Sequence, residues 1–204
     1  MKTSSLPLRT LATAAACALL SASSFAQAPA PGAAPAPGAP AAPGAPTATP
    51  APKPLGPSEK SFLKNATKST LFQLELSKAA KAMTDVGAAK VRDGVIKDLT
   101  KVLAKLNEFA TSRGEKVPTE LEGTDKADVE RLSKTKEDKM AKEYIETILK
   151  ESKRLDKDFE SAGKTLQDAD TKMVIVNYGQ LVHGVFTSAE AAEKAAKDPK
   201  NKKK

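Results

Sequence analysis

The chain has 204 residues, with 33 Lys and Arg against 25 Asp and Glu, so its formal net charge at pH 7 is +8. It contains one cysteine, one histidine and no tryptophan. Few side chains are therefore suited to catalysis at neutral pH, and little is available for stacking on nucleic-acid bases. The basic residues also alternate with acidic ones, which is typical of a solvated helix face. We expect no specific nucleic-acid binding.

Residues 1–28 have the pattern of a secretory signal peptide. A basic start with Lys2 and Arg9 leads into an apolar stretch over 11–20, and the segment closes on small residues. The stretch has about half of the roughly 20 residues that a membrane-spanning helix needs, so we expect no retained transmembrane helix. Removal of the signal also removes Cys17, and the mature chain then forms no disulfide. Lipidation at Cys17 is the less favoured alternative, because no leucine-led box precedes it. The sequence predicts export to the periplasm or cell envelope, or secretion.

Residues 29–57 form a segment rich in Pro, Ala and Gly. Eleven of the fourteen prolines lie here. Proline favours the polyproline II conformation, so we expect a disordered, extended linker of about 3.1 Å per residue. It is either a passive tether or a spacer that lets the following domain work at a distance from a surface.

Residues 58–112 change abruptly to a helical pattern. A first helix is predicted over 58–83, followed by a turn over 84–88 that contains Gly87. The second helix, over 89–112, has the clearest apolar stripe of the chain. Gly114 and Pro118 then predict its end. The stripe consists of Val91, Val95, Leu99, Val102, Leu106 and Phe109.

The rest of the chain predicts a short helix over 126–134 and two long ones over 137–162 and 168–197. We expect Gly163 to close the first of the long helices. The β-branched run at 174–176 also fits a buried strand, but no second strand is available to pair with it. Four amphipathic helices of about 25 residues predict an all-α, antiparallel four-helix bundle over 58–197. The basic tail is residues 198–204.

The candidate site residues are few. Dinuclear metal sites in helical bundles need a Glu from two helices and a Glu-x-x-His from the other two, and His183 is the only histidine, outside that motif. Weak candidates for a carboxylate or metal site are His183, Asp98 and Glu75. Glu143 and Glu151 also lie at the edges of apolar stripes. The competing interpretation is a partly buried structural histidine, with the carboxylates pairing with nearby lysines. We expect no cofactor.

Four short segments are distinctive in their order and spacing: Leu74-Glu75-Leu76, Val95-Ile96-Lys97-Asp98, Gly114-Glu115-Lys116-Val117-Pro118 and Lys142-Glu143-Tyr144-Ile145. Over about 59–196 they resemble the bacterial family called domain of unknown function 4142. The resemblance implies a ferritin-like bundle in an exported or outer-membrane protein.

The chain departs from the family pattern at polar positions. Asp98 is followed by Leu99 where relatives carry Asp-His, and Gln73 stands where a glutamate is expected. Ser152 lies near the expected third-helix histidine, while His183 matches the last one within one register step. If relatives hold a polar or metal site here, the resemblance implies that this degenerate member has lost most of it.

These observations favour an exported, non-catalytic helical bundle that acts as an envelope-associated interaction or structural domain. The first alternative is a degenerate ferritin-like metal or redox protein that uses His183. The second is a basic adaptor for anionic envelope polymers, because the charge after signal removal is +6. The expected partner is thus an envelope protein or an anionic polymer.

Overall fold

The computed structural model describes residues 53–81 and 83–198. These residues fall within one compact unit, residues 49–204. The predicted signal peptide, most of the predicted linker and the tail beyond Asp198 lie outside the described residues. Within them the elements are all helices, as predicted, and no strand is present. The helices are α1 (Pro57–Ala79), α2 (Val86–Ser112), α3 (Gly123–Ser133), α4 (Glu137–Thr165) and α5 (Ala169–Lys197).

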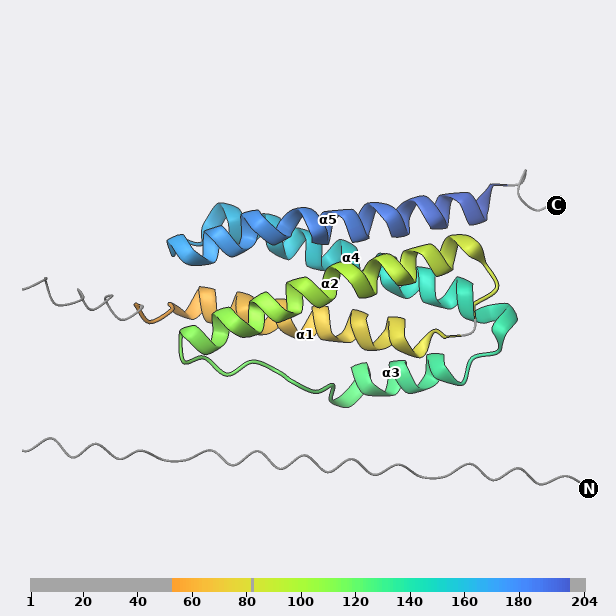
Figure 1. The fold of residues 1–204 in the computed structure, drawn as a ribbon, viewed down its shortest axis with the longest axis horizontal. Coiled ribbons are helices and arrows are strands. Elements are labelled where there is room, and N and C mark those ends of the chain that lie inside the picture. The colour runs from red at the N-terminus through yellow and green to blue at the C-terminus, as the bar shows by residue number, and fades with distance from the viewer. Residues whose placement is uncertain (1–52, 82, 199–204) are drawn as a thin grey trace, which may run out of the picture. The chain divides into compact units, whose positions relative to one another are not determined.

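Four of the helices form the predicted bundle. Around it the order is α1, α2, α5 and α4, and each helix packs on the next. Neighbours in this ring run antiparallel, so α1 and α5 share one direction and α2 and α4 the other (Figure 1). Helix α3 lies along α1 within the crossover from the end of α2 to the start of α4. Ferritin-like bundles also have one long crossover, and the ferritin-like assignment itself stays a prediction.

Helix α1 is buried on nearly every side over residues 69–77, and α2, α3 and α4 all pack against the helix. Its buried set therefore includes polar side chains as well as leucines. Helix α2 buries a single stripe, and all six residues predicted for that stripe lie in the core. The buried polar side chains of α1 are Thr67, Ser69, Thr70, Gln73 and Ser77.

The connection between α1 and α2 differs from the prediction. Helix α1 ends at Ala79 and not at residue 83, and α2 begins at Val86, so Gly87 lies in its first turn. The early start follows from Asp85, whose Oδ1 accepts a hydrogen bond from the Ala88 amide at 2.7 Å and caps the helix. At the other end, Gly114 has a φ of 67° and follows the last turn of α2 as predicted.

Gly163 does not end α4, contrary to the prediction. The helix continues to Thr165, and Leu166 leaves it in an extended conformation. A β-carbon on Gly163 would lie 3.4 Å from Cγ2 of Ile175, which is an ordinary van der Waals contact, so Gly163 lies within α4 where α5 packs beside it. The β-branched run at 174–176 is helical and belongs to α5.

Arg113 joins three parts of the domain at one end of the bundle. Its side chain is only 3% exposed, and Nη2 lies 3.3 Å from Oδ1 of Asp168. The guanidinium also pairs with Asp170 and donates to the carbonyl oxygen of Lys53. It lies over the ring of Phe109, 5.2 Å from the ring centroid. Arg113 thereby ties the first described residues to the end of α2 and the start of α5.

Electrostatics at this junction favour an ionised Asp168. Partial burial acts to raise the pKa of Asp168, but hydrogen bonds from the backbone and side chain of Thr171, together with Arg113, outweigh it and lower the pKa. Leu55, two residues after the Lys53 carbonyl that Arg113 binds, is also buried in the core. Residues 53–56 therefore pack as part of the domain.

Candidate functional site

The interior of the bundle contains a chain of polar contacts between α1 and α4. The Ser77 hydroxyl donates to the carbonyl oxygen of Gln73 at 2.7 Å and lies 2.9 Å from the hydroxyl of Tyr144. Because the single Ser77 proton points at Gln73, the Tyr144 hydroxyl is the donor in the second bond. Both side chains are fully buried. The contact joins two helices across the core.

The Gln73 side chain extends this chain of contacts along α1. Its Nε2 donates to Oγ of Ser69 at 3.4 Å. Oε1 of Gln73 and the hydroxyls of Thr67 and Thr70 are buried and find no hydrogen-bond partner among the described residues. Burying such groups without partners costs stability. Helix α1 thus contributes neutral polar groups to the core at a cost in stability.

Tyr144 remains neutral in this setting. Burial raises the pKa of its phenol well above the usual value of 10.0, and the hydrogen bond with Ser77 opposes the shift only in part. The phenol is therefore a hydrogen-bond donor across the physiological range. It does not serve there as a base or as an anionic ligand.

The positions at which the sequence departs from the family pattern are interior ones. Gln73, Leu99 and Ser152 are all buried, and Ser152 donates to the carbonyl oxygen of Leu149 at 3.3 Å. Every buried polar side chain among the described residues is uncharged apart from the Arg113 guanidinium at the edge of the bundle. The centre is therefore built for packing and neutral hydrogen bonding.

The three candidate site residues lie on three different helices and each has its own partner. Glu75 on α1 pairs with Lys78 at 2.8 Å, and Asp98 on α2 lies 3.8 Å from Lys101. His183 on α5 has Nδ1 3.2 Å from Asp156 of α4. Across residues 53–81 and 83–198, no three His, Cys, Asp or Glu side chains come close enough together to hold a metal ion.

His183 is more exposed than the sequence suggested. Its side chain is 60% exposed, so the expectation of a partly buried position is wrong, and the neighbouring Val182 is the residue that enters the core. Glu143 and Glu151 are partly buried and pair with the exposed side chains of Arg131 and Arg154 respectively. Each carboxylate is thus engaged with an arginine of its own.

Two of the grooves beside α5 are lined by candidate site residues. The first, of about 740 Å³, lies between α4 and α5. Its apolar part is Phe159 and Ile175, and its polar part is Asp156, Glu160, Gln180 and His183, of which Glu160 pairs with Lys164. The His183 and Asp156 side chains contact one another across it. The pair gives the groove a polar edge but no third ligand.

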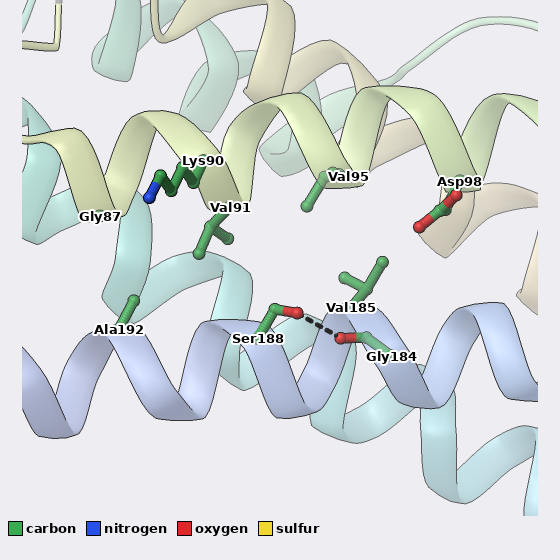
Figure 2. Close-up of a pocket in the computed structure, with 10 residues that line it drawn as sticks. Gly87, Lys90, Val91, Val95, Asp98, Gly184, Val185, Ser188 and Ala192 are labelled. Carbon is green, nitrogen blue, oxygen red and sulfur yellow. Dashed lines mark hydrogen bonds between the residues drawn. The ribbon is translucent and has the colours of Figure 1, made fainter.

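The second groove, of about 280 Å³, lies between α2 and α5. Figure 2 shows Lys90 and Asp98 towards its two ends, with Val91 and Val95 between them on the same helix. Its α5 wall is made of small side chains, and the Ser188 hydroxyl donates to the carbonyl oxygen of Gly184 at 2.7 Å (Figure 2). The Ser188 proton is thus engaged within its own helix, which argues against a nucleophilic serine.

The Ser77–Tyr144 contact and the Arg113 junction were not predicted from the sequence. Tyr144 lies four residues from both Met140 and Ile148, which is helical spacing, and Ser77 follows Gln73 by one turn. These spacings were the available signal for a buried hydrogen bond between the two helices. Arg113 carried no comparable signal, because its partners at 53, 168 and 170 are about sixty residues away in either direction.

Comparison with known proteins gives one match. Residues 44–198 match the family model described as Domain of unknown function (DUF4142). No curated protein and no solved structure matches the chain. In addition, none of the helices in the described part of the chain has the length and apolar character needed to cross a membrane.

Proposed function

The chain belongs to the DUF4142 family, and we propose that in this member the bundle is an exported, non-catalytic domain that binds an envelope component through its surface. The proposal combines two independent arguments. Residues 1–28 supply the argument for export. The arrangement of polar side chains supplies the argument for binding without catalysis.

The observation that carries the proposal is the separation of the candidate residues. Glu75, Asp98 and His183 lie on three helices, and each is engaged with a different charged neighbour. Catalysis requires groups positioned together around one reacting atom. The interior, where relatives would place such groups, is filled here by Leu99 and by neutral hydrogen bonds. We therefore assign the binding function to the surface of the bundle.

The distribution of charge supports a protein partner for the bundle over a polymer. Residues 53–198 carry 27 Lys and Arg and 25 Asp and Glu, a net charge of +2. Four further lysines, at 200 and 202–204, follow the bundle. Most of the positive charge of the mature chain therefore lies outside the helices, and attraction to anionic polymers is assigned to the tail.

Affinity capture from envelope fractions of the native host tests the binding role. A chain that begins at residue 29 is compared with one that begins at residue 53, which keeps the buried Leu55 and the Lys53 carbonyl that Arg113 binds. We expect both chains to capture the same component. Capture that is lost in the shorter chain, or absent from both, would contradict binding by the bundle.

Metal analysis tests the alternative of a metal or redox protein. The purified chain is compared with His183→Ala and with Gln180→Ala, an exposed position one turn away on the same helix. We expect no stoichiometric metal in any of the three. Iron, manganese or zinc that is stoichiometric and lost only in His183→Ala would overturn the non-catalytic proposal.

Removal of residues 199–204 tests the assignment of polymer binding to the tail. We expect retention on peptidoglycan or lipopolysaccharide to weaken steeply between low and physiological salt, and to disappear without the tail. Retention that survives the deletion would place the polymer site on the bundle.

A further inference from the structure

The side of α5 that faces away from the bundle is uncharged over several turns. Residues 173–189 contain no Asp, Glu, Lys or Arg, in a chain with 28% charged residues. Met173 is 61% exposed and Val176 is 72% exposed, and only Val86 among the other described residues is a comparably exposed large apolar residue. We define the α5 outer face as Met173, Val176, Gln180, Gly184 and Thr187.

Gly184 has no role inside its own chain that requires a glycine. It lies in the middle of α5, and a β-carbon built on it would meet nothing within 4 Å. A glycine in a helix interior is less favourable than an alanine. The space above Gly184 is thus available to an apolar side chain from another molecule.

The α5 outer face is complementary to itself. Val176 and Gly184 lie four residues before and after Gln180, and Met173 and Thr187 lie seven residues before and after it. A two-fold axis through Gln180 brings two copies of the helix together antiparallel. Val176 of each copy then meets the partner's Gly184, and Met173 meets the partner's Thr187. The large side chain of each pair lies opposite a smaller one.

We propose that a second copy of this chain docks on the α5 outer face as an antiparallel, two-fold dimer. A two-fold contact places the same surface on both sides, so a charged face would repel itself, whereas this one is neutral. The outer surface of α4 is different, because it alternates charges such as Lys142, Glu146 and Lys150. The outer face of α5 is therefore better suited to self-association than that of α4. The inference does not depend on the proposed binding function.

The length of the contact limits the area that it can bury. Residues 173–187 span about 21 Å of helix at a rise of 1.5 Å per residue. One helix pair of this length falls below the roughly 1,200 Å² at which standard stable interfaces begin. We therefore expect a reversible dimer that forms at micromolar concentrations.

Sedimentation equilibrium between 1 and 500 µM tests the dimer. The intact chain is expressed with residues 1–57 in place, so that any natural processing occurs, and is then purified. We expect a monomer–dimer equilibrium in the wild type. Gly184→Leu should weaken it at least 10-fold, because the leucine occupies the space that Val176 of the partner subunit needs.

The matched control is Gly94→Leu. Gly94 is also a mid-helix glycine whose β-carbon would meet nothing within 4 Å, but it lies on α2, on the opposite wall of the α2–α5 groove from Gly184. The Gly94→Leu substitution should change the dissociation constant of the dimer by no more than 2-fold. Thermal melting at low concentration verifies that both variants fold.

Gln180→Glu provides a second test that hardly changes side-chain size. The two-fold axis places residue 180 opposite its own copy, so the variant sets two negative charges face to face. We expect about 5-fold weaker association at low salt and recovery towards the wild-type value at 0.5 M salt. A wild-type monomer up to 500 µM would overturn the proposal. So would a dimer that Gly184→Leu and Gln180→Glu leave unchanged.

Discussion

Helices α1 and α5 place polar and apolar side chains in opposite ways. Helix α1 buries Gln73 and Ser77 within the core, whereas α5 exposes Met173 and Val176 to solvent. The difference follows from the number of neighbours, since three helices cover α1 and two long ones flank α5. Whether a side chain in this bundle is buried therefore depends on how many helices surround its own helix, as well as on its hydropathy. Helix α1 buries polar side chains where apolar ones would fill the core, and α5 exposes apolar side chains that are not packed within the monomer.

The largest change in stability is expected when a charge is placed on the buried side of α1. Gln73→Glu puts a carboxylate at a fully buried position. We expect a loss of about 3–5 kcal/mol in the free energy of unfolding at neutral pH. Burial would raise the pKa of the new carboxyl, so the folded state would hold its proton more tightly than the unfolded state. The loss should therefore shrink as the pH falls towards 4, measured by urea denaturation.

Gln73→Leu is the matched control for that variant. It removes Oε1, which has no partner among the described residues, and fills a similar volume. Replacing an unsatisfied buried group by an apolar one is neutral or stabilising. A large destabilisation by leucine would show that Gln73 makes a contact that the interior depends on.

Arg113→Ala should have the next largest effect. It leaves Asp168 without the guanidinium and the Lys53 carbonyl without its donor. We expect a loss of about 2–3 kcal/mol, below the range for a wholly buried pair, because Asp170 on the other side of the guanidinium is largely exposed. Arg113→Lys should recover only part of the loss, since an ammonium group cannot reach all three partners. A lysine variant as stable as the wild type would contradict the junction between Arg113 and its three partners.

Tyr144 links α1 to α4 and gives the fold an alkaline limit. Because its pKa is raised in the folded state, its contribution to stability is complete below the usual value of 10.0 and is lost as the pH rises above it. Tyr144→Phe should cost about 1 kcal/mol at pH 7 through the lost bond to Ser77. The variant should also lose less stability than the wild type between pH 9.5 and 11.5. An unchanged pH profile, followed by circular dichroism, would place the alkaline transition elsewhere.

The smallest effect is expected on α5. Val176→Gln replaces an exposed valine by a polar side chain that suits a helix well. We expect the free energy of unfolding to change by no more than about 0.5 kcal/mol, measured at concentrations below dimerisation. A loss above 1 kcal/mol would mean that Val176 is packed within the monomer, and the contrast with α1 would fail.

The sequence was sufficient for α2 but only partly for α1. The stripe from Val91 to Phe109 is periodic and apolar, so its burial followed from spacing alone. On α1 the helix was predicted, yet the burial of Thr67 and Thr70 depends on α2, α3 and α4. Contacts between distant segments leave no periodic signal in the segment that they bury.

The surroundings of Gly163 and the separation of the candidate site residues could not be predicted from the sequence either. Gly163 has the spacing of a helix end, but it lies inside α4, and Ile175, twelve residues further on, packs beside it. Glu75, Asp98 and His183 each lie near an apolar stripe, and only the arrangement of helices separates them. Local chemistry could be read from the sequence, while distances between helices could not.

The junction at Arg113 has a mechanical consequence. If the chain upstream of Lys53 tethers the domain, any pulling force enters the bundle at that residue. The guanidinium binds the Lys53 carbonyl and the carboxylates at the start of α5, and its own backbone caps the end of α2. Load is then divided among three helices instead of peeling α1 away from its first turn. A single side chain would thereby set the force at which a tethered bundle begins to unravel.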